Sequence, residues 1–215
     1  MGKILLAQNV EKKFGFFSAL THISFSLDSP SIVGFIGPNG SGKTTLLKIF
    51  ATLLPPTSGK VAILGKDISR ESEQIRREIS VLFHHPGFYE ELTGKENLCL
   101  FFRILRGRAD SPDVEEALEW AGLNRRADAP VRTYSRGMKQ KLALARALFL
   151  PAQLFLLDEP FTALDDDGIA RTSSRFLHLL QQGKTILFTA HRWIHSPLLP
   201  VHLYHLENGR ISHSE

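Results

Sequence analysis

The hydrophobic positions of this chain fall in short runs that are separated by amphipathic stretches. Short apolar or alternating runs predict β-strands at residues 4–10, 23–27, 32–36, 60–64, 79–83, 153–157 and 184–190. Amphipathic stretches, together with a short polar one, predict helices at residues 44–53, 72–77, 136–150 and 168–181. Near the end, residues 201–206 and 210–212 predict a hairpin, because Asn208-Gly209 suits a tight turn.

The middle of the chain has a different period. From residue 93 to residue 150 the pattern is almost wholly helical, with a helix start at 110–113 and a break at Gly122. Strands and helices alternate on both sides of this segment, which predicts an α/β sheet covered on both faces. We expect a single domain over residues 1–215. Its nucleotide-binding core comprises residues 1–85 and 151–215, and its inserted helical subdomain comprises residues 86–150.

The composition excludes some classes of protein but does not indicate a function. The 215 residues are 43% hydrophobic and 22% charged, as in an ordinary globular domain. The formal net charge of +4 is too small to identify a nucleic-acid partner, and none is expected. Cys99 is the single cysteine, which excludes an intrachain disulfide and fits a reducing compartment. The sequence has neither a secretory signal nor a run of roughly 20 apolar residues that could span a bilayer.

A glycine-rich segment lies between a predicted strand and a predicted helix. Its residues Gly37, Gly42, Lys43 and Thr44 match the phosphate-loop pattern G-x-x-x-x-G-K-[ST]. The glycines let backbone N–H groups point at phosphate oxygens, and the helix N-terminus adds a partial positive charge. Lys43 is expected to reach the β- and γ-phosphates, and the Thr44 hydroxyl to hold Mg²⁺. A chance glycine-rich turn is the alternative, which the flanking elements disfavour. The expected nucleotide-binding residues here are Gly37, Pro38, Asn39, Gly40, Ser41, Gly42, Lys43, Thr44 and Thr45.

Two acids follow the predicted strand at residues 153–157. A carboxylate at the C-terminal end of a parallel strand lies at the edge where open α/β sheets bind ligands. We therefore expect Asp158 to help organise Mg²⁺ and Glu159 to polarise the attacking water. An ordinary strand end with solvated acids is the alternative.

Three further segments have the order and spacing of one protein family. Residues 134–140, Tyr-Ser-Arg-Gly-Met-Lys-Gln, resemble the signature motif of ABC-type ATPases, usually written LSGGQ. Residues 162–165 resemble the D-loop of that family, and residues 188–191 its switch-histidine segment. The resemblance covers nearly the whole chain. It implies a P-loop NTPase sheet of ABC-ATPase type, with an inserted all-helical subdomain and an N-terminal antiparallel β part. It also implies ATP and Mg²⁺ as ligands and ATP hydrolysis as the activity.

Members of this family pair head to tail around two ATP molecules, so the resemblance implies a homodimer. Ser135 and the Gly137 N–H group, at a helix start, would then grip the γ-phosphate bound by the partner. Arg136 replaces a usual glycine and fits if its side chain points outward. For Ser135 by itself, a helix N-cap is the alternative interpretation. The expected signature residues are Tyr134, Ser135, Arg136, Gly137 and Met138.

The resemblance assigns roles to three more side chains. Asp165 would contact the opposite phosphate loop, and a solvated loop acid is the alternative. His191 would contact the γ-phosphate and orient the water, and a surface or structural histidine is the alternative. Phe14 occupies the position of the aromatic residue that stacks on adenine, an interaction worth about 1–3 kcal/mol. Phe16 and Phe17 compete for that role, and burial in the core is the third possibility.

The clearest departure from the family follows the predicted strand at residues 79–83. A glutamine that contacts Mg²⁺ and the lytic water is usual there, and His84 fills the slot in this chain, with His85 as the other candidate. Histidine changes charge near pH 6.5, which gives the hypothesis that ATP turnover is unusually sensitive to pH. Simple packing of His84 is the alternative. This histidine and the residues after it resemble the ATPase subunit of the cytochrome c maturation haem exporter.

The resemblance therefore implies the ATP-hydrolysing subunit of a membrane exporter, possibly one that exports haem for cytochrome c biogenesis. It would lie on the cytoplasmic face of the inner or plasma membrane, bound to separate permease subunits that dock near residues 84–105. Another small drug, lipid or ABC-2-type exporter is an alternative, as are a soluble ATPase of iron–sulfur assembly and a nucleotide-binding regulator. The aromatic residues expected in the docking groove, for which core packing is the alternative, are Phe88, Tyr89, Phe101 and Phe102.

Overall fold

A computed structural model of the chain describes residues 3–84, 87–106, 111–192 and 199–213. In these residues the larger sheet has six strands in the order β10-β9-β3-β8-β7-β6. Neighbouring strands from β9 to β6 are parallel, and β10 pairs antiparallel with β9 at one edge. The strands are β3 (Ile32–Ile36), β6 (Ile79–Leu82), β7 (Leu154–Leu157), β8 (Thr185–Ala190), β9 (Val201–Glu207) and β10 (Arg210–His213). The three central strands β3, β8 and β7 are buried almost throughout, as expected for a parallel sheet covered on both faces.

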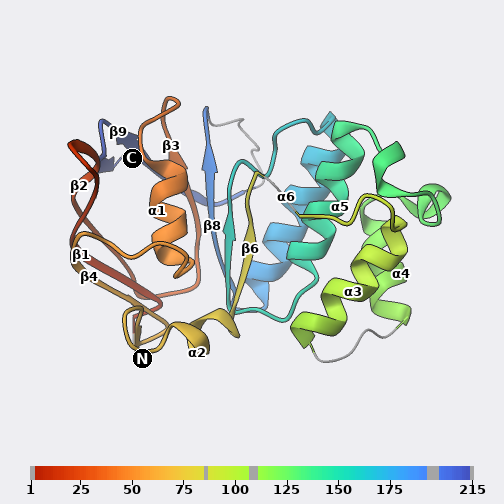
Figure 1. Ribbon diagram of the computed structural model, residues 1–215, viewed down its shortest axis with the longest axis horizontal. Helices are drawn as coiled ribbons and strands as arrows, with labels where there is room; N and C mark the ends of the chain where they lie inside the picture. The colour runs from red at the N-terminus through yellow and green to blue at the C-terminus, as the bar shows by residue number, and fades with distance from the viewer. Residues whose placement is uncertain (1–2, 85–86, 107–110, 193–198, 214–215) are drawn as a thin grey trace.

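The second sheet of the described residues is antiparallel and has the order β2-β1-β4-β5. Its strands are β1 (Leu5–Phe14), β2 (Phe17–Leu27), β4 (Ser58–Ile63) and β5 (Lys66–Asp67). Figure 1 shows this sheet at one end of the molecule, with α1 lying between it and the parallel sheet. The two sheets and α1 share one hydrophobic core, to which each of them contributes buried side chains.

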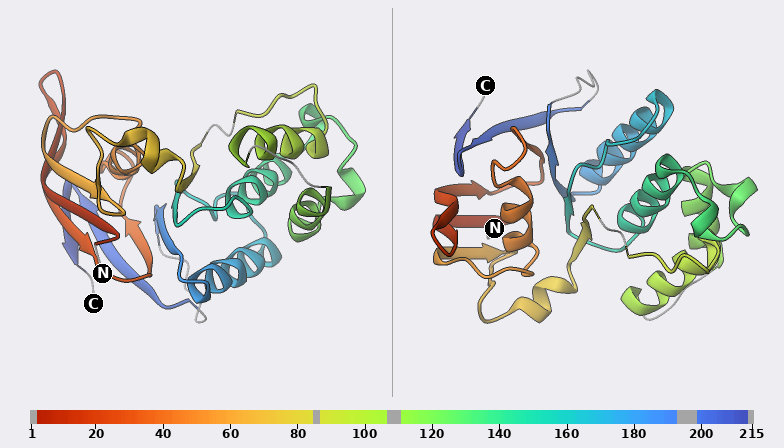
Figure 2. Two further views of the ribbon diagram at one scale, coloured as in Figure 1. Left: turned by 90° about the horizontal axis from the view of Figure 1, so that it is seen from below. Right: turned by 45° about the horizontal axis from the view of Figure 1, so that its top comes forward.

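Helices α5 and α6 pack on the other face of the parallel sheet, and α3 and α4 pack against α5. The helices are α1 (Lys43–Phe50), α2 (Ser72–Arg76), α3 (Gly94–Arg106), α4 (Ser111–Trp120), α5 (Arg136–Leu148) and α6 (Asp166–Gln181). Figure 2 shows α3, α4 and α5 gathered at the end of the molecule that lies away from the antiparallel sheet. None of the helices in the described ranges combines the length and hydrophobicity that crossing a bilayer requires.

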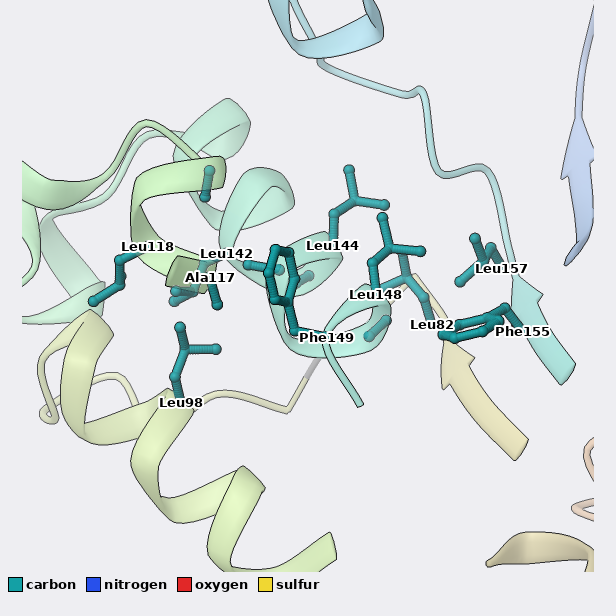
Figure 3. Close-up of a cluster of buried hydrophobic side chains, with 14 of the residues drawn as sticks. Leu82, Leu98, Ala117, Leu118, Leu142, Leu144, Leu148, Phe149, Phe155 and Leu157 are labelled. Carbon is teal, nitrogen blue, oxygen red and sulfur yellow. The ribbon is translucent and has the colours of Figure 1, made fainter. Parts of the chain in front are cut away.

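Helix α5 joins the helical end of the molecule to the sheet. In Figure 3 its leucines, among them Leu144 and Leu148, lie between Leu98 of α3 and Phe155 of β7. All four of these side chains are at most 1% exposed. Full burial of one such side chain stabilises the fold by roughly 1.5–3 kcal/mol, so α5 is held on both sides by apolar packing.

The α/β architecture with an N-terminal antiparallel part is confirmed, and most element boundaries lie close to those expected. The Asn208-Gly209 hairpin is also confirmed: both residues have positive φ values, 48° and 72°, and Glu207 pairs with Arg210 across the turn.

Three expectations were wrong in detail. Residues 121–135 contain short 3-10 turns, at Asn124–Arg126 and Val131–Thr133, instead of continuous helix. Residues 66–67, which lie outside the predicted strands, form the short strand β5. Phe102, expected in a docking groove, is 0% exposed and belongs to the core.

Candidate active site

The phosphate loop joins β3 to α1 at the C-terminal edge of the parallel strands (Figure 1). At both of its ends a side chain would not fit. A Cβ atom added to Gly37 would lie 2.1 Å from the carbonyl oxygen of Leu206, and one added to Gly42 would lie 2.6 Å from that of Ala19. Gly42 also has a φ of 105°, which favours glycine. The close approach of β9 and β2 thus makes the loop a narrow cradle of backbone.

Lys43 is folded into this cradle. Its side chain is 6% exposed, and its ammonium group donates to the carbonyl oxygens of Gly37 at 2.7 Å and Pro38 at 2.8 Å. Burial lowers the pKa of Lys43, and the carboxylates of Glu159 and Asp158 oppose that shift. Phosphate oxygens are charged and accept hydrogen bonds more strongly than neutral carbonyls, so the β- and γ-phosphates of a nucleotide fit this position.

Ser41 gives a second indication that the loop accepts a ligand. The residue is 3% exposed, and in the described part of the chain its Oγ atom has no hydrogen-bond partner. Buried hydroxyl groups almost always have a partner. The cradle therefore contains a polar group that a bound nucleotide can satisfy.

Thr44 and Asp158 form a donor set for Mg²⁺. The Thr44 Oγ1 atom lies 3.1 and 2.9 Å from the two carboxylate oxygens of Asp158. Asp158 is 7% exposed, and its Oδ1 atom also accepts from the Thr189 hydroxyl at 2.6 Å. Mg²⁺ is usually held in proteins by one or two carboxylates, waters and the phosphates of its substrate. A hydroxyl and a fixed carboxylate beside the phosphate cradle fit that preference.

Glu159 has a sparsely populated backbone conformation, with a φ of 49°. Its N–H group donates to the Thr189 hydroxyl at 2.9 Å, and its carboxylate accepts from the Thr162 hydroxyl at 3.2 Å. Residues held in such conformations cluster at active sites, where the surroundings fix them. Thr189 therefore holds the backbone of Glu159, and Thr162 holds its carboxylate.

Both candidate histidines border pockets that Glu159 also lines. One pocket, of about 350 Å³, contains Glu159, Thr189 and His191 in its walls. Another, of about 320 Å³, contains Glu159, Asp158 and His84. The structure thus brings all of these side chains to one edge of the sheet. Direct contact of the histidines with water or phosphate stays a prediction, and His85 lies outside the described residues.

The signature turn, residues 134–138, has a buried end and an exposed end. Tyr134 is 5% exposed, and its hydroxyl donates to the Arg126 carbonyl at 2.6 Å, so it anchors the turn inside the helical subdomain. This burial raises the pKa of Tyr134. Ser135 and Arg136 are exposed, and Arg136 also lines the pocket that contains Asp158 and Glu159.

Ser135 caps α5, because its Oγ atom accepts from the N–H group of Met138 at 3.2 Å. Asp165 caps α6 in the same way, accepting from Gly168 at 3.0 Å, and it pairs with Lys141 at 2.9 Å. These capping roles are structural. Contact of either residue with a second subunit stays a prediction.

The aromatic side chains at the β1–β2 turn are exposed. Phe14 is 49% exposed, Phe17 63%, and Phe16 fully exposed. Burial in the core, one of the alternatives for Phe14, is therefore wrong. The Lys12 ammonium lies 5.2 Å from the centre of the Phe14 ring. All three rings remain available for stacking on a base.

Thr189 is a site residue that the sequence did not predict; it is 0% exposed and bonded to both site acids. A signal was present, since Thr189 is a polar residue at the end of an apolar strand, one position before Ala190-His191. Its contact with Asp158 depends on the pairing of β7 with β8, which the sequence does not reveal.

Comparison with known proteins finds relatives over most of the chain. A family model described as "ABC transporter" matches residues 20–162. The bacitracin transport ATP-binding protein BcrA of Bacillus licheniformis is 35% identical over 193 residues, which are 89% of this chain and 62% of that protein. The Nod factor export ATP-binding protein I of Burkholderia lata is 36% identical over 205 residues, 94% of this chain and 67% of that protein. The chain thus spans about two thirds of the length of these relatives.

The fold of the chain closely resembles that of a solved structure. It is the dimeric structure of a post-hydrolysis state of the ATP-binding cassette MJ0796, bound to ADP and Pi. The TM-score is 0.88 at 28% sequence identity, and the match covers 98% of this chain and 97% of that one. The likeness therefore includes both sheets and the inserted helices.

Proposed function

Because the chain belongs to the ABC transporter family, we propose that it is the ATP-binding and ATP-hydrolysing subunit of a membrane exporter. The observation that carries this proposal is the bonded pair Thr44 and Asp158 beside the buried ammonium group of Lys43. At this edge of the sheet Lys43 supplies a positive charge for phosphate, and Thr44 and Asp158 supply oxygen ligands for Mg²⁺. The dimeric relative that holds ADP and Pi supports hydrolysis as the activity.

In the proposed mechanism the phosphate loop orients the nucleotide. Lys43 exchanges its carbonyl partners for the β- and γ-phosphates. Thr44 and Asp158 would hold Mg²⁺, which would neutralise charge at the phosphates when bound. Glu159 accepts a hydrogen bond from the attacking water and is kept in position by Thr189 and Thr162.

His191 and His84 complete the proposed water site. Each borders a pocket that Glu159 lines, which supports the proposal that both imidazoles contact a water held by that carboxylate. His191 also lines a pocket of about 410 Å³ with Gly37 and Pro38, which puts it beside the phosphate loop. We assign His191 to the γ-phosphate and His84 to the slot in which the family has glutamine.

The proposed working form is a homodimer. Ser135 and the Gly137 N–H group lie at the exposed start of α5, where backbone N–H groups and the helix dipole favour an anion. In the dimer they bind the γ-phosphate held by the partner copy, and Asp165 faces the partner's phosphate loop. The dimeric state of MJ0796 supports this arrangement.

A groove of about 390 Å³ is the proposed docking site for a membrane partner. Leu53, Ile104 and Leu105 in its walls are 54%, 64% and 56% exposed, an unusual concentration of surface apolar residues. Phe101 also lines it, and the Arg146 guanidinium lies 4.6 Å from the centre of that ring. Arg146 and the signature turn are at opposite ends of α5, so this helix links the groove to the nucleotide site.

The names of the relatives favour an exporter of drug-like or lipid-like compounds, since one is named for bacitracin transport and the other for Nod factor export. Haem export for cytochrome c biogenesis is the narrower alternative, which rests on His84 and the residues after it. In either case the subunit would lie on the cytoplasmic face of the inner or plasma membrane, attached through its permease partner. Co-purification with a multi-spanning protein supports an exporter, whereas a soluble complex would favour an ATPase of iron–sulfur assembly.

The test of hydrolysis is the Glu159→Gln variant. Removal of the carboxylate should reduce ATP turnover by roughly 10²–10⁴-fold while ATP stays bound, so that a stable ATP-dependent dimer appears in size-exclusion chromatography. Glu119→Gln, the same substitution at an exposed position of α4, is the control and should behave as wild type. Turnover near the wild-type rate in Glu159→Gln would remove Glu159 from the proposed role.

A further inference from the structure

One face of α5 lies against the segment that follows Asp158. Gly137, Gln140 and Lys141 are three and four residues apart, so they share that face of the helix. Towards the C-terminal end the same face continues through the buried residues Leu144 and Leu148. The polar beginning of this face contacts residues 159–165, which connect the site acids to α6.

Each of the three residues makes a different contact with this segment. The Gln140 amide donates to the carbonyl oxygens of Pro160 at 3.1 Å and of Glu159 at 3.4 Å. The Lys141 ammonium lies 2.9 and 3.0 Å from the two carboxylate oxygens of Asp165. A Cβ atom on Gly137 would lie 3.0 Å from the Ala163 carbonyl oxygen, so the helix and the segment are close here.

The contacted segment has an unusual backbone. Glu159 and Ala163 have φ values of 49° and 60°, which are uncommon for residues other than glycine. Such conformations persist when the surrounding structure determines them. Gln140 bonds to the peptide of the first of these residues, and Gly137 approaches that of the second.

We infer that Gln140 and Lys141 are positioning residues that fix the signature turn relative to Glu159 and Asp165 of the same chain. This inference rests on the proposed function, because it concerns the surface that one copy presents to the other. Ser135 and Asp165 lie on that surface, and the contacts of α5 hold both at one spacing. A dimer closes over ATP with the correct geometry when that spacing matches the partner's phosphate loop.

If Gln140 and Lys141 only stabilised the fold, their loss would affect nucleotide binding and dimer closure together. As positioning residues they should affect dimer closure alone. Binding of nucleotide to one protomer depends on Lys43, Thr44 and the phosphate loop, none of which Gln140 or Lys141 contacts. Closure of the dimer and turnover depend on the signature turn and on Glu159. Loss of the α5 contacts should therefore leave the first property intact and impair the second.

The variants Lys141→Met and Gln140→Met keep the length of each side chain and remove its polar contact. We expect each to bind a fluorescent ATP analogue as wild type does and to melt within a few degrees of it. The kcat for ATP should fall roughly ten- to a hundredfold, as displacements of about 1 Å do in other sites. In the Glu159→Gln background, the dissociation constant of the ATP-bound dimer should rise by a similar factor. Lys141→Arg keeps the charge and should therefore retain most of the wild-type kcat and dimer affinity.

Arg171→Met is the matched control. It removes an ion pair with Asp167, at 3.0 Å, and a hydrogen bond to the Trp120 carbonyl, at 3.5 Å, and it leaves the polar groups of Gln140 and Lys141 in place. Wild-type kcat and dimer affinity in Lys141→Met and Gln140→Met, or an equal loss in Arg171→Met, would overturn the inference. So would a large loss of protomer nucleotide affinity, since that outcome indicates general unfolding. If unmodified protein neither hydrolyses ATP nor dimerises as Glu159→Gln, the proposed function itself fails.

Discussion

The phosphate-loop side and the signature side of the site differ in how complete they are within one chain. On the phosphate-loop side, Lys43 and Asp158 are 6% and 7% exposed, and both are held by several contacts. On the signature side, Ser135 and Arg136 are exposed, and Ser135 bonds to its own helix. Preorganised groups stabilise an incoming charge without reorganisation. The exposed signature turn has no comparable set of contacts around Ser135 and Arg136 in the described part of the chain. The phosphate-loop side is thus preorganised within one chain, and the exposure of the signature side fits the proposal that it binds the nucleotide held by a second copy.

This difference predicts different consequences for equally small changes on the two sides. A change on the phosphate-loop side should abolish nucleotide binding by a single protomer. A change on the signature side should leave that binding intact and affect only what two protomers do together.

The largest effect is expected for Lys43→Met. It removes the buried ammonium group from the phosphate cradle, and loss of one such preorganised charge donor typically costs about 10²–10³-fold in rate. Both nucleotide affinity, measured by fluorescence titration, and ATP turnover should fall. Lys48→Met changes an exposed lysine of the same helix and should leave both unchanged. Wild-type affinity in Lys43→Met would contradict the assignment of the cradle.

The second-largest effect is expected for Ser135→Asp. This variant distinguishes the role of Ser135 as a helix cap from its proposed contact with the nucleotide of the partner copy. Aspartate is as good an N-cap as serine, so the free energy of unfolding should stay near that of wild type. Its negative charge would face the γ-phosphate held by the other copy, and turnover should fall by about 10²-fold if that contact resembles an oxyanion donor. Nucleotide binding by the protomer should not change. Normal turnover would mean that Ser135 is a helix cap and nothing more.

The two sides also differ in how far the sequence predicts them. The place of the phosphate loop between a strand and a helix was predicted because its requirements are local: glycines at both ends, a lysine and a threonine at fixed spacing, and a strand and helix on either side. The signature motif was found by likeness alone, because Ser135 at a helix start predicts a cap equally well.

What the sequence did not reveal depends on contacts between distant segments. Thr189 bonds to Asp158 because β7 and β8 are neighbours in register, Leu157 beside Phe188. Gln140 reaches the Pro160 carbonyl because α5 packs beside the segment after β7. Phe102 and Tyr89 are both aromatic residues of the predicted docking segment, yet the first is 0% and the second 57% exposed. Local pattern cannot distinguish these outcomes, since packing across the fold decides them.

The smallest effect concerns the Lys141–Asp165 pair on the signature side. The hydrogen bond from Lys141 is the main cause that lowers the pKa of Asp165 from its ordinary value of 3.8, and the Gly168 N–H group adds to it. A lowered carboxyl pKa stabilises the fold above the ordinary value, and this contribution disappears as the pH falls through the lowered value. The difference in free energy of unfolding between wild type and Lys141→Met should therefore be small at neutral pH and vanish in acid.

Denaturant titrations at neutral and at acid pH measure that difference. A difference that persists below the pKa of Asp165 would show that the methylene packing of Lys141 against Gly168 matters more than its charge.

The claim that the active site is shared between two copies is tested most directly by mixing Lys43→Met with Ser135→Asp. Each variant alone should be nearly inactive. A mixed dimer holds one site with both defects and one site with neither, because the intact phosphate loop of one copy meets the intact signature turn of the other. Random pairing should therefore restore up to about a quarter of wild-type ATP turnover. Activity that never exceeds the sum of the two variants, at any mixing ratio that forms dimers, would contradict the shared site.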